Sequence, residues 1–438
     1  MHSAASTLPP GPAQPPAWQL LGWTVRPGAW LERCHARYGD AFTMRAPGAQ
    51  PLVLIADPAA VKAVFTADPA IMQVGPGRGG IRPMFGDSSL LLLDGHEHLR
   101  RRRMLLPPFH GERVAGYDDV MAEVTEREVA DWPAGRPFTL QARLQRITLD
   151  VILRTVFGME EGARMEDLRA RIEWLLGATA SPLAFLFVAV PALRRGLAAR
   201  GFERMKSAMD EAIFDVIRRR RADRNLAERD DVLSLLLLAR DEDGRALDDD
   251  QVRDELVTLL LAGHETTETA LAWTFDALWR HPAVLERLTA ECRDSAGEGE
   301  YLGAVVEEAL RLRPPVAFGD RTLAEPHEVA GHMLPAGCRV APCIYLVHRR
   351  PDVYPRPHAF RPERFLERPP ETYTWLPFGG GVRRCLGASF ATLEMKVVLR
   401  TILRRVRLEA ASSRPATARR RSIVLAPAGG ARAVAVRD

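Results

Sequence analysis

The strongest chemical signal in the sequence is a glycine-rich segment around one cysteine, residues 378–387 (F-G-G-G-V-R-R-C-L-G). Glycines adopt positive φ easily and, having no side chain, let a flat ligand approach the backbone closely. Arg383 and Arg384 precede Cys385, and neighbouring positive charge favours the thiolate, which is the metal-binding form of cysteine. A helix is predicted over residues 388–403, so the cysteine would lie near a helix N-terminus that favours its anion further. The alternative interpretation is a glycine-rich turn around a buried free cysteine.

The other cysteines do not indicate a second site. The chain has five cysteines in 438 residues, an odd number, so a disulfide framework is not expected. Cys338 and Cys343 have no second pair of Cys or His that would complete a zinc site. Residues 75–80 match G-x-G-x-x-G, but they do not stand between a convincing strand and a helix, which favours a loop. Residues 264–268 begin like a zinc protease helix and lack its second histidine.

The cysteine segment resembles the haem-binding loop of the cytochrome P450 family, whose pattern is F-x-x-G-x-R-x-C-x-G. All five specified positions match, at Phe378, Gly381, Arg383, Cys385 and Gly387. The resemblance implies haem b as the cofactor, with Cys385 as the axial thiolate on its iron. It also implies that Phe378 packs beside the thiolate and that Arg383 pairs with a haem propionate. A thiolate ligand donates electron density to the iron and favours cleavage of the O–O bond.

A second motif of the resemblance is E-x-x-R, at Glu308 and Arg311. Alone this spacing is a common surface ion pair. The order of motifs distinguishes this copy, because two prolines follow it at 314–315 and residues 362–365 (P-E-R-F) stand between it and the cysteine. The resemblance implies that Glu308, Arg311 and Arg364 form a buried ion triad supporting the haem loop. Removal of one partner from such a triad should destabilise the protein.

A long helix is predicted over residues 249–280, with three acids at its start and a proline beyond its end. Its residues 262–267 (A-G-H-E-T-T) resemble the family's [A/G]-G-x-[D/E]-T motif, and the resemblance implies a central helix over the haem. Glu265 and Thr266 would deliver protons to oxygen, while Gly263 would leave room for it. For Thr267 we prefer a hydroxyl bonded to the carbonyl four residues earlier.

Further haem contacts are implied on the propionate side. His98 and Arg102 match an H-x-x-x-R motif before a P-x-F, and their i, i+4 spacing places them on one helix face. Arg321, just past the two prolines, fits another propionate contact. The remaining arginines of residues 100–103 are interpreted as a solvated basic face, which could attract an acidic electron donor.

The substrate pocket would draw, by family position, on residues 73–91, 176–197, 261–266, 316–320 and 422–425. An apolar cleft binds apolar molecules by desolvation, so we expect a terpenoid, steroid, polyketide or fatty acid. Each candidate has an equally good interpretation as a core residue. The candidates are Met84, Phe85, Phe185, Leu261, Ala262, Val316, Phe318, Ile423 and Val424.

The elements that must position these residues are mostly helices. Helical periodicity also predicts helices over 114–132, 140–157 and 201–221. Short strands are predicted at 51–56, 422–425 and 431–436, the last two as a hairpin around Gly429 and Gly430. The predicted fold class is therefore mainly α with small β-sheets, the cytochrome P450 fold. We expect an extended proline-rich arm over residues 1–30 and one haem domain over residues 31–438.

The composition and charge of the chain limit the kinds of partner that it can bind. The 60 basic and 56 acidic residues leave a net charge of +4, and only three of the basic residues are lysines. Such a balance does not support nucleic-acid binding. The longest apolar run, residues 183–193, is shorter than the ~20 residues of a bilayer span, so neither a membrane anchor nor a signal peptide is expected. A cytoplasmic location is the simplest expectation.

The resemblance implies a haem-thiolate monooxygenase that acts in secondary metabolism on a hydrophobic small molecule with O2. Electrons would come from a separate ferredoxin with its reductase, or from a flavodoxin, and a monomer is expected. Two alternatives stay open: a peroxide-using or non-oxidative family member, and a non-catalytic haem-binding recruitment or sensor protein. The intact pair of Glu265 and Thr266 argues against both.

Overall fold

The computed structural model describes residues 8–179, 197–294, 299–421 and 423–436. Helices account for 55% of the chain and the strands are two to five residues long, so the predicted class, mainly α with small sheets, is confirmed. The chain divides into two compact units. The first unit contains Met1–Gln73, Met121–Gln145 and Thr266–Asp438, and the second contains Val74–Val120 and Arg146–Glu265.

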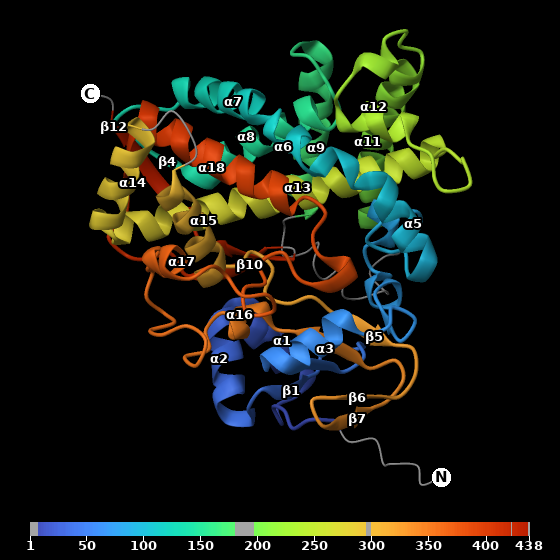
Figure 1. Ribbon diagram of the computed structural model, residues 1–438, viewed down its shortest axis with the longest axis vertical. Coiled ribbons are helices and arrows are strands. Elements are labelled where there is room, and N and C mark those ends of the chain that lie inside the picture. Colours follow the sequence, from blue (N-terminus) through green and yellow to red (C-terminus); the bar gives the residue numbers. More distant parts are fainter. Residues whose placement is uncertain (1–7, 180–196, 295–298, 422, 437–438) are drawn as a thin grey trace. The chain divides into compact units, whose positions relative to one another are not determined.

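The first unit holds a five-stranded sheet with the order β1-β2-β8-β5-β3 (Figure 1). Its strand β2 (Leu52–Ile55) is buried along its whole length, pairing antiparallel with β1 and parallel with β8. Leu52 and Leu54 belong to one apolar cluster, whereas Val53 and Ile55 belong to another. Because side chains alternate along a strand, each face of β2 packs into its own core. The other strands of this sheet are β1 (Ala41–Met44), β3 (Met72–Gln73), β5 (Arg321–Leu323) and β8 (Arg339–Pro342).

The predicted hairpin at the C-terminal end is wrong. Strand β11 (Val424–Pro427) pairs with β10 (Ala418–Arg421), while β12 (Arg432–Val436) lies between β4 (Pro137–Thr139) and β9 (Arg407–Ala410). The turn at Gly429 and Gly430 exists, but Leu140 and Gln141 donate backbone hydrogen bonds to Ala431 and Gly430. The chain leaving the turn therefore joins a different sheet. The remaining strands, β6 (His327–Val329) and β7 (His332–Leu334), form a separate pair.

Helices of the first unit surround the segment that carries the cysteine. Helix α15 packs against α17, α18 and α14, and the short α3 packs against the 3-10 turn η5 within the cysteine loop. Helix α18 is buried along much of one side, including the acidic residue Glu394. The helices are α1 (Pro16–Val25), α2 (Pro27–Tyr38), α3 (Pro58–Thr66), α14 (Pro282–Asp294), α15 (Glu300–Leu312), α16 (Ile344–Val347), α17 (Glu363–Glu367), η5 (Gly381–Arg383) and α18 (Ala388–Arg405).

The expected extended arm is correct only in part. Residues 8–15 contain no helix, but α1 and α2 begin at Pro16 and Pro27. A proline at the first helical position is well tolerated, because its missing N–H is not needed there and its φ suits the helix. Pro9, Pro10 and Pro12, which suggested the extended chain, lie in the stretch without helix, whereas Pro16 and Pro27 each start a helix. A single domain over residues 31–438 stays a prediction.

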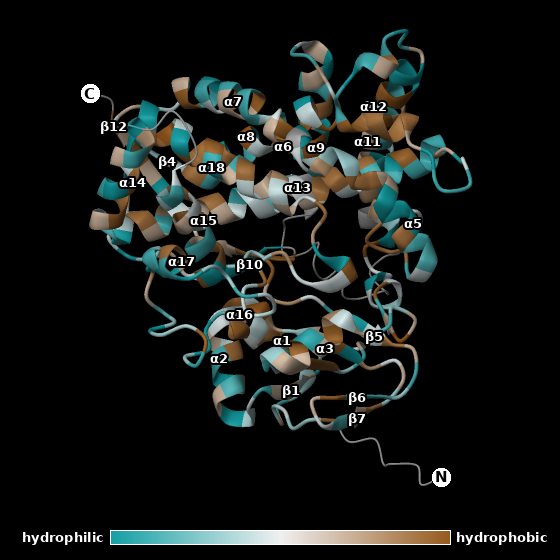
Figure 2. Ribbon diagram, viewed as in Figure 1, coloured by the Kyte–Doolittle hydropathy of each residue, from teal (hydrophilic) through white to brown (hydrophobic). Residues whose placement is uncertain are grey.

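The second unit is helical throughout its described residues. Helix α11 packs against α9 and α12, and α12 (Val232–Leu238) is the strongly hydrophobic helix seen in Figure 2. Asp231 caps α12 by accepting from the N–H of Ser234, and the buried Arg220 pairs with Asp231. The other elements are η1 (Gly75–Arg78), α4 (Arg82–Phe85), α5 (Gly95–Leu105), η2 (Pro107–Phe109), α6 (Glu112–Ala115), α9 (Ala163–Thr179), α11 (Leu197–Arg221) and η4 (Leu226–Glu228).

Three helices run from one unit into the other: α7 (Asp118–Ala130), α8 (Leu140–Thr155) and α13 (Asp249–Arg280). The bounds of α13 are those predicted, and the unit boundary falls between Glu265 and Thr266. Among the described residues, no helix combines the length and the apolar character needed to cross a membrane.

Candidate functional site

The cysteine loop of the first unit is shaped by glycines. Gly379 and Gly381 have φ of +68° and +64°, a region that residues with a Cβ adopt rarely. A Cβ on Gly381 would overlap the carbonyl oxygen of Phe65 in α3, so this position needs a glycine for space as well as for φ. The backbone N–H of Cys385 donates to the carbonyl of Phe378 at 2.9 Å, which closes the loop just before α18.

Cys385 differs from the other cysteines in exposure. It is exposed, whereas the other four are buried and unpaired with one another. Burial raises the pKa of Cys34, Cys292 and Cys338 to about 11 and that of Cys343 to about 12. Those four side chains are therefore neutral thiols that face protein atoms. The loop presents Cys385 alone as a thiol that a ligand can reach.

Glu308, Arg311 and Arg364, the triad that the resemblance implies, lie together in the structure. Glu308 and Arg311 are both fully buried, and two nitrogens of Arg311 donate to the two carboxylate oxygens at 2.7 and 2.9 Å. Arg364 Nε lies 3.1 Å from Glu308 Oε1, and the backbone N–H of Arg361 donates to the same oxygen at 2.8 Å. Arg311 also donates to the carbonyl of His348 at 2.7 Å. The buried charges are thus surrounded by partners, which such burial requires.

His348, a residue that sequence reasoning missed, joins the triad to the cysteine loop. Its Nδ1 lies 3.0 Å from the carbonyl of Arg311, and the backbone N–H of Leu376 donates to its Nε2 at 2.7 Å. Burial, with the nearby charges of Arg311 and Arg349, holds the pKa of His348 well below its usual range. The ring is therefore neutral, with Nδ1 donating and Nε2 accepting. No local pattern marks this histidine, because its partners lie 37 and 28 residues away.

Arg321 lies close to the same loop. It is buried, and its guanidinium carbon stands 5.5 Å from the ring centre of Phe65, the residue that limits Gly381. The Phe65 ring stacks on Tyr373 with centres 6.4 Å apart. The structure therefore brings Arg321 into the neighbourhood of the cysteine loop, as the sequence order suggested. Arg383 lies within η5 of the loop itself.

Helix α13 carries its candidate residues on one face. Leu261, Ala262, Glu265 and Thr266 are partly or largely exposed, while His264 and Thr267 are buried. The spacing i, i+1, i+4, i+5 places the exposed four on the same side of a helix. Gly263 packs close to α8: a Cβ there would lie 2.8 Å from Ile152 Cδ1, the end of a side chain that would have to shift.

Sequence reasoning also missed Glu394, nine positions after the cysteine in α18. It is 1% exposed, and burial raises its pKa to about 8, an effect that a hydrogen bond from the Thr267 side chain opposes. In the described part of the chain no basic side chain pairs with it. Its position on the inner side of α18 was visible from helical spacing, but its lack of a cationic partner was not.

Helix α5 of the second unit carries the other predicted propionate residues. His98 is buried and Arg102 half-buried. The interpretation of the neighbouring arginines as a solvated face is wrong for Arg101, which is 2% exposed and pairs with Glu255 at 3.0 Å. Arg100 pairs with Asp241 at 3.2 Å. Arg101 is therefore a buried residue within a basic run, because its partner Glu255 comes from a distant part of the chain.

Residues 9–431 match the family described as Cytochrome P450. This chain is a cytochrome P450. It is 41% identical over 433 residues to a protein of Mycobacterium tuberculosis named cytochrome P450 135B1, covering 97% of this chain and 90% of that protein. It is 40% identical over 400 residues to a second protein of that organism, named cytochrome P450 137, covering 90% and 83%.

Solved P450 structures share the fold. A cyanobacterial CYP120A1 with bound retinoic acid aligns at a TM-score of 0.84 and 24% identity, covering 98% of this chain and 99% of that one. The haem domain of cytochrome P450DA aligns at 0.82 and 25%, covering 98% of each chain. P450s are haem monooxygenases that bind O2 and hydrophobic substrates and take electrons from redox partners. Their cofactor is haem with an axial cysteine thiolate.

The residues of this P450 fit that cofactor. Thiolate is the ligand type required, and the accessible thiol stands on a loop whose glycines leave no side chain between backbone and a flat ligand. Arg321 and Arg383 provide cations near the same loop for carboxylates.

The predicted substrate residues divide into three groups. Met84, Phe85 and Val316 are half-buried, and Ile423 is 60% exposed. Val424 is fully buried in β11, and the half-buried Phe318 ring packs 5.4 Å from that of Trp23 beside an apolar cluster. Phe185 and most of residues 176–197 lie outside the described residues.

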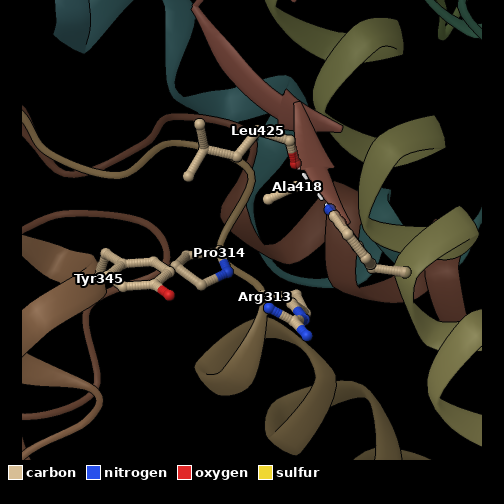
Figure 3. A pocket seen from close by; sticks show the side chains of 6 residues that line it. Arg313, Pro314, Tyr345, Ala418 and Leu425 are labelled. Atoms are coloured by element: carbon tan, nitrogen blue, oxygen red, sulfur yellow. Dashed lines mark hydrogen bonds between the residues drawn. The ribbon is translucent and has the colours of Figure 1, made fainter. Parts of the chain in front are cut away.

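One small cavity of the first unit is not a substrate site. It has a volume of about 10 Å³, which is room for no more than one water. Trp273 donates a hydrogen bond from its indole nitrogen to the carbonyl of Leu425 at 2.6 Å. Figure 3 shows Arg313, Pro314, Tyr345, Ala418 and Leu425 around the cavity. Its lining residues are Trp273, Arg313, Pro314, Tyr345, Ala418 and Leu425.

Proposed function

We propose that this P450 binds haem through Cys385 and inserts one oxygen atom from O2 into a hydrophobic small molecule, by hydroxylation or epoxidation. The observation that carries the proposal is the exposed thiol of Cys385 on a loop supported by His348 and the buried triad. When bound, haem iron with a thiolate ligand supplies the oxygen-activating chemistry. The protein supplies binding, orientation and protons.

The haem propionates are assigned to four cationic side chains, those of Arg321, Arg383, His98 and Arg102. A guanidinium binds a carboxylate through two parallel hydrogen bonds, which fixes the orientation of the ring as well as its position. Phe378 and Gly387 complete the loop around the ligand cysteine. The Glu308 triad holds that loop and takes no part in the chemistry.

Protons are assigned to the pair Glu265 and Thr266 on the accessible face of α13. The Thr266 hydroxyl can hold a water by accepting and donating hydrogen bonds, and the Glu265 carboxyl can reload that water with a proton. Partial exposure of both side chains supports this role, since a relay needs contact with solvent at one end.

The substrate is proposed to be apolar, of the terpenoid, steroid, polyketide or fatty-acid type, in contact with Met84, Phe85, Leu261, Ala262, Val316 and Ile423. Electrons are proposed to come from a separate ferredoxin and its reductase, or from a flavodoxin. The protein would act as a monomer.

A carbon monoxide difference spectrum tests the central claim. The reduced protein should show the red-shifted Soret band of a thiolate ligand, and Cys385→Ala should abolish it. Cys292→Ala is the matched control, because Cys292 is a buried thiol of the same unit, and its spectrum should equal that of the wild type. A wild-type spectrum without the shifted band would exclude thiolate ligation.

Turnover separates the proposed reaction from its alternatives. With a generic ferredoxin, its reductase, NADPH and O2, the protein should oxidise members of an apolar compound library, and Thr266→Ala should consume O2 with less product. Product formation with peroxide alone, and none with O2, would favour a peroxide-using enzyme.

A further inference from the structure

A segment of the second unit, residues 84–90, begins with the last two residues of α4 and continues into the loop that follows; we call it loop 84–90. Consecutive residues of helix α13 hold it. Arg253, Asp254 and Glu255 each hydrogen-bond to this loop, about 165 positions away in the sequence. We call these three residues the α13 anchor. Met84 and Phe85, the pair that we assign to the substrate pocket, stand at the beginning of the loop.

Arg253 fixes the start of the loop. Its Nη2 donates to the carbonyl of Met84 at 3.2 Å, and the side chain is 4% exposed. Two carboxylates orient the guanidinium of Arg253. Asp210 of α11 accepts a hydrogen bond from Nε at 2.9 Å, and Asp254 accepts one from Nη1 at 2.9 Å. A buried arginine with two carboxylate partners has little freedom to move, so the carbonyl of Met84 has a defined position.

Asp254 fixes the turn that follows. Its Oδ2 accepts from the backbone N–H of Ser88 at 2.9 Å. Gly86 has a φ of +85°, and a Cβ there would overlap the Asp254 carboxylate. The loop thus comes so close to α13 that only glycine fits at this position.

Glu255 and Thr258 fix the end of the loop. The N–H of Leu90 donates to Glu255 Oε1 at 3.1 Å, and the hydroxyls of Ser89 and Thr258 are 2.7 Å apart. Arg101 of α5 bridges both partners, donating to Glu255 Oε1 at 3.0 Å and to the carbonyl of Ser88 at 3.1 Å. These groups are buried, where unmade hydrogen bonds are costly, so the contacts hold the loop strongly.

We propose that Arg253, Asp254 and Glu255 are positioning residues that hold loop 84–90 as a preset wall and thereby determine which hydrophobic ligands the enzyme accepts at Met84 and Phe85. The selectivity part rests on the proposed function, which places this pair in the substrate pocket. Because loop 84–90 is already ordered before a ligand binds, binding does not have to pay the entropy of ordering it. The fixed loop also excludes ligands that would fit only if it moved. The anchor residues touch the loop backbone and not the ligand.

Hydrogen exchange of the haem-loaded protein tests the anchoring directly. The amides of Ser88 and Leu90 should be protected in the wild type. Asp254→Ala and Glu255→Ala should raise their exchange rates at least tenfold, and Asp254→Asn, which keeps an acceptor oxygen, should give a smaller rise. Asp249→Asn is the matched control, since Asp249 lies on the same helix and pairs with Arg221 instead of the loop. Unchanged exchange in Asp254→Ala would overturn the anchoring.

Ligand affinity tests selectivity through the Soret shift caused by azoles. Asp254→Ala should weaken 4-phenylimidazole at least fivefold while imidazole, too small to reach the wall, changes less than twofold, and Asp254→Asn should restore most of the loss. Equal changes for both azoles, or none despite faster exchange, would overturn the selectivity role. Loss of the thiolate band in the wild type would instead contradict the proposed function, and the anchoring would then be judged from exchange alone.

Discussion

Each unit buries a carboxylate within a polar network, and the two carboxylates differ in the number of guanidinium groups that pair with them. Glu308 of the first unit and Glu255 of the second are both fully buried. Glu308 meets Arg311 and Arg364, whereas Glu255 meets one guanidinium, that of Arg101. Burial raises the pKa of Glu255 to about 7, with Arg101 opposing the rise.

Glu394 extends this comparison to a carboxylate with no cation. Its pKa is raised further, to about 8. The series teaches that cations decide whether a buried acid is ionised, because desolvation penalises the charged form and a nearby positive charge offsets that penalty. A carboxylate paired with two guanidiniums suits the support of the cysteine loop, which must keep its shape, whereas Glu255 and Glu394 can change charge near neutral pH.

The largest effect is expected from breaking the fully paired network. Arg311→Ala removes one of the two guanidiniums that pair with the buried Glu308, and it leaves the carbonyls of His348 and Pro357 without this donor. We expect a loss of about 3–5 kcal/mol in the free energy of unfolding, with loss of haem. Urea unfolding and the haem content of the purified protein measure it. Arg368→Gln, at an exposed pair with Glu371, should cost less than about 0.5 kcal/mol. An Arg311→Ala protein of normal stability would remove the basis of the comparison.

The next effect concerns the carboxylate without a cation. The folded-state pKa of Glu394, about 8, lies above its ordinary value of 4.5, so the folded protein keeps a proton that the unfolded chain releases between these values. The unfolding free energy should therefore fall as pH rises through this window. Compared with Glu394→Gln, the wild type should lose roughly 3–5 kcal/mol between pH 5 and pH 9. Urea unfolding at several pH values measures it, and the exposed Glu409→Gln should show no such difference.

A smaller effect is expected at the singly paired acid. Arg101→Gln removes the guanidinium partner of Glu255, but that carboxyl can take up a proton instead of remaining as an unpaired charge. We expect a cost of about 2–3 kcal/mol at pH 8 that shrinks below pH 7. Arg103→Gln, on the exposed side of α5, should have little effect at either pH. A cost independent of pH would show that Glu255 stays ionised.

The smallest effect on the free energy of unfolding is expected at His348, the neutral histidine between the triad and the cysteine loop. His348→Phe keeps the ring volume but leaves the N–H of Leu376 without its acceptor, at a cost of about 1–2 kcal/mol. The shifted Soret band should persist with faster haem loss, because the loop loses one support and keeps its cysteine. Haem transfer to apomyoglobin measures the rate, with the exposed His358→Phe as control. If His348→Phe loses haem at the wild-type rate, His348 does not connect the triad to the cysteine loop.

The sequence by itself determined the family, the fold class and the bounds of α13, because these depend on patterns along the chain: five fixed positions in ten residues, helical periodicity and the order of the motifs. That order, and not the three-residue spacing alone, distinguished Glu308 and Arg311, while the roles of Cys385 and the propionate residues stay predictions.

Only the tertiary structure decided which partners distant residues find. Arg101 is buried, although it lies in a basic run that we interpreted as a solvated face. Strand β12 pairs with β4 and β9 instead of forming the predicted hairpin. Loop 84–90 is hydrogen-bonded to α13. The tertiary structure also revealed His348 and Glu394, whose surroundings come from other helices and loops. Burial and pairing depend on contacts between segments that are far apart in the chain, and a single sequence carries no record of those contacts.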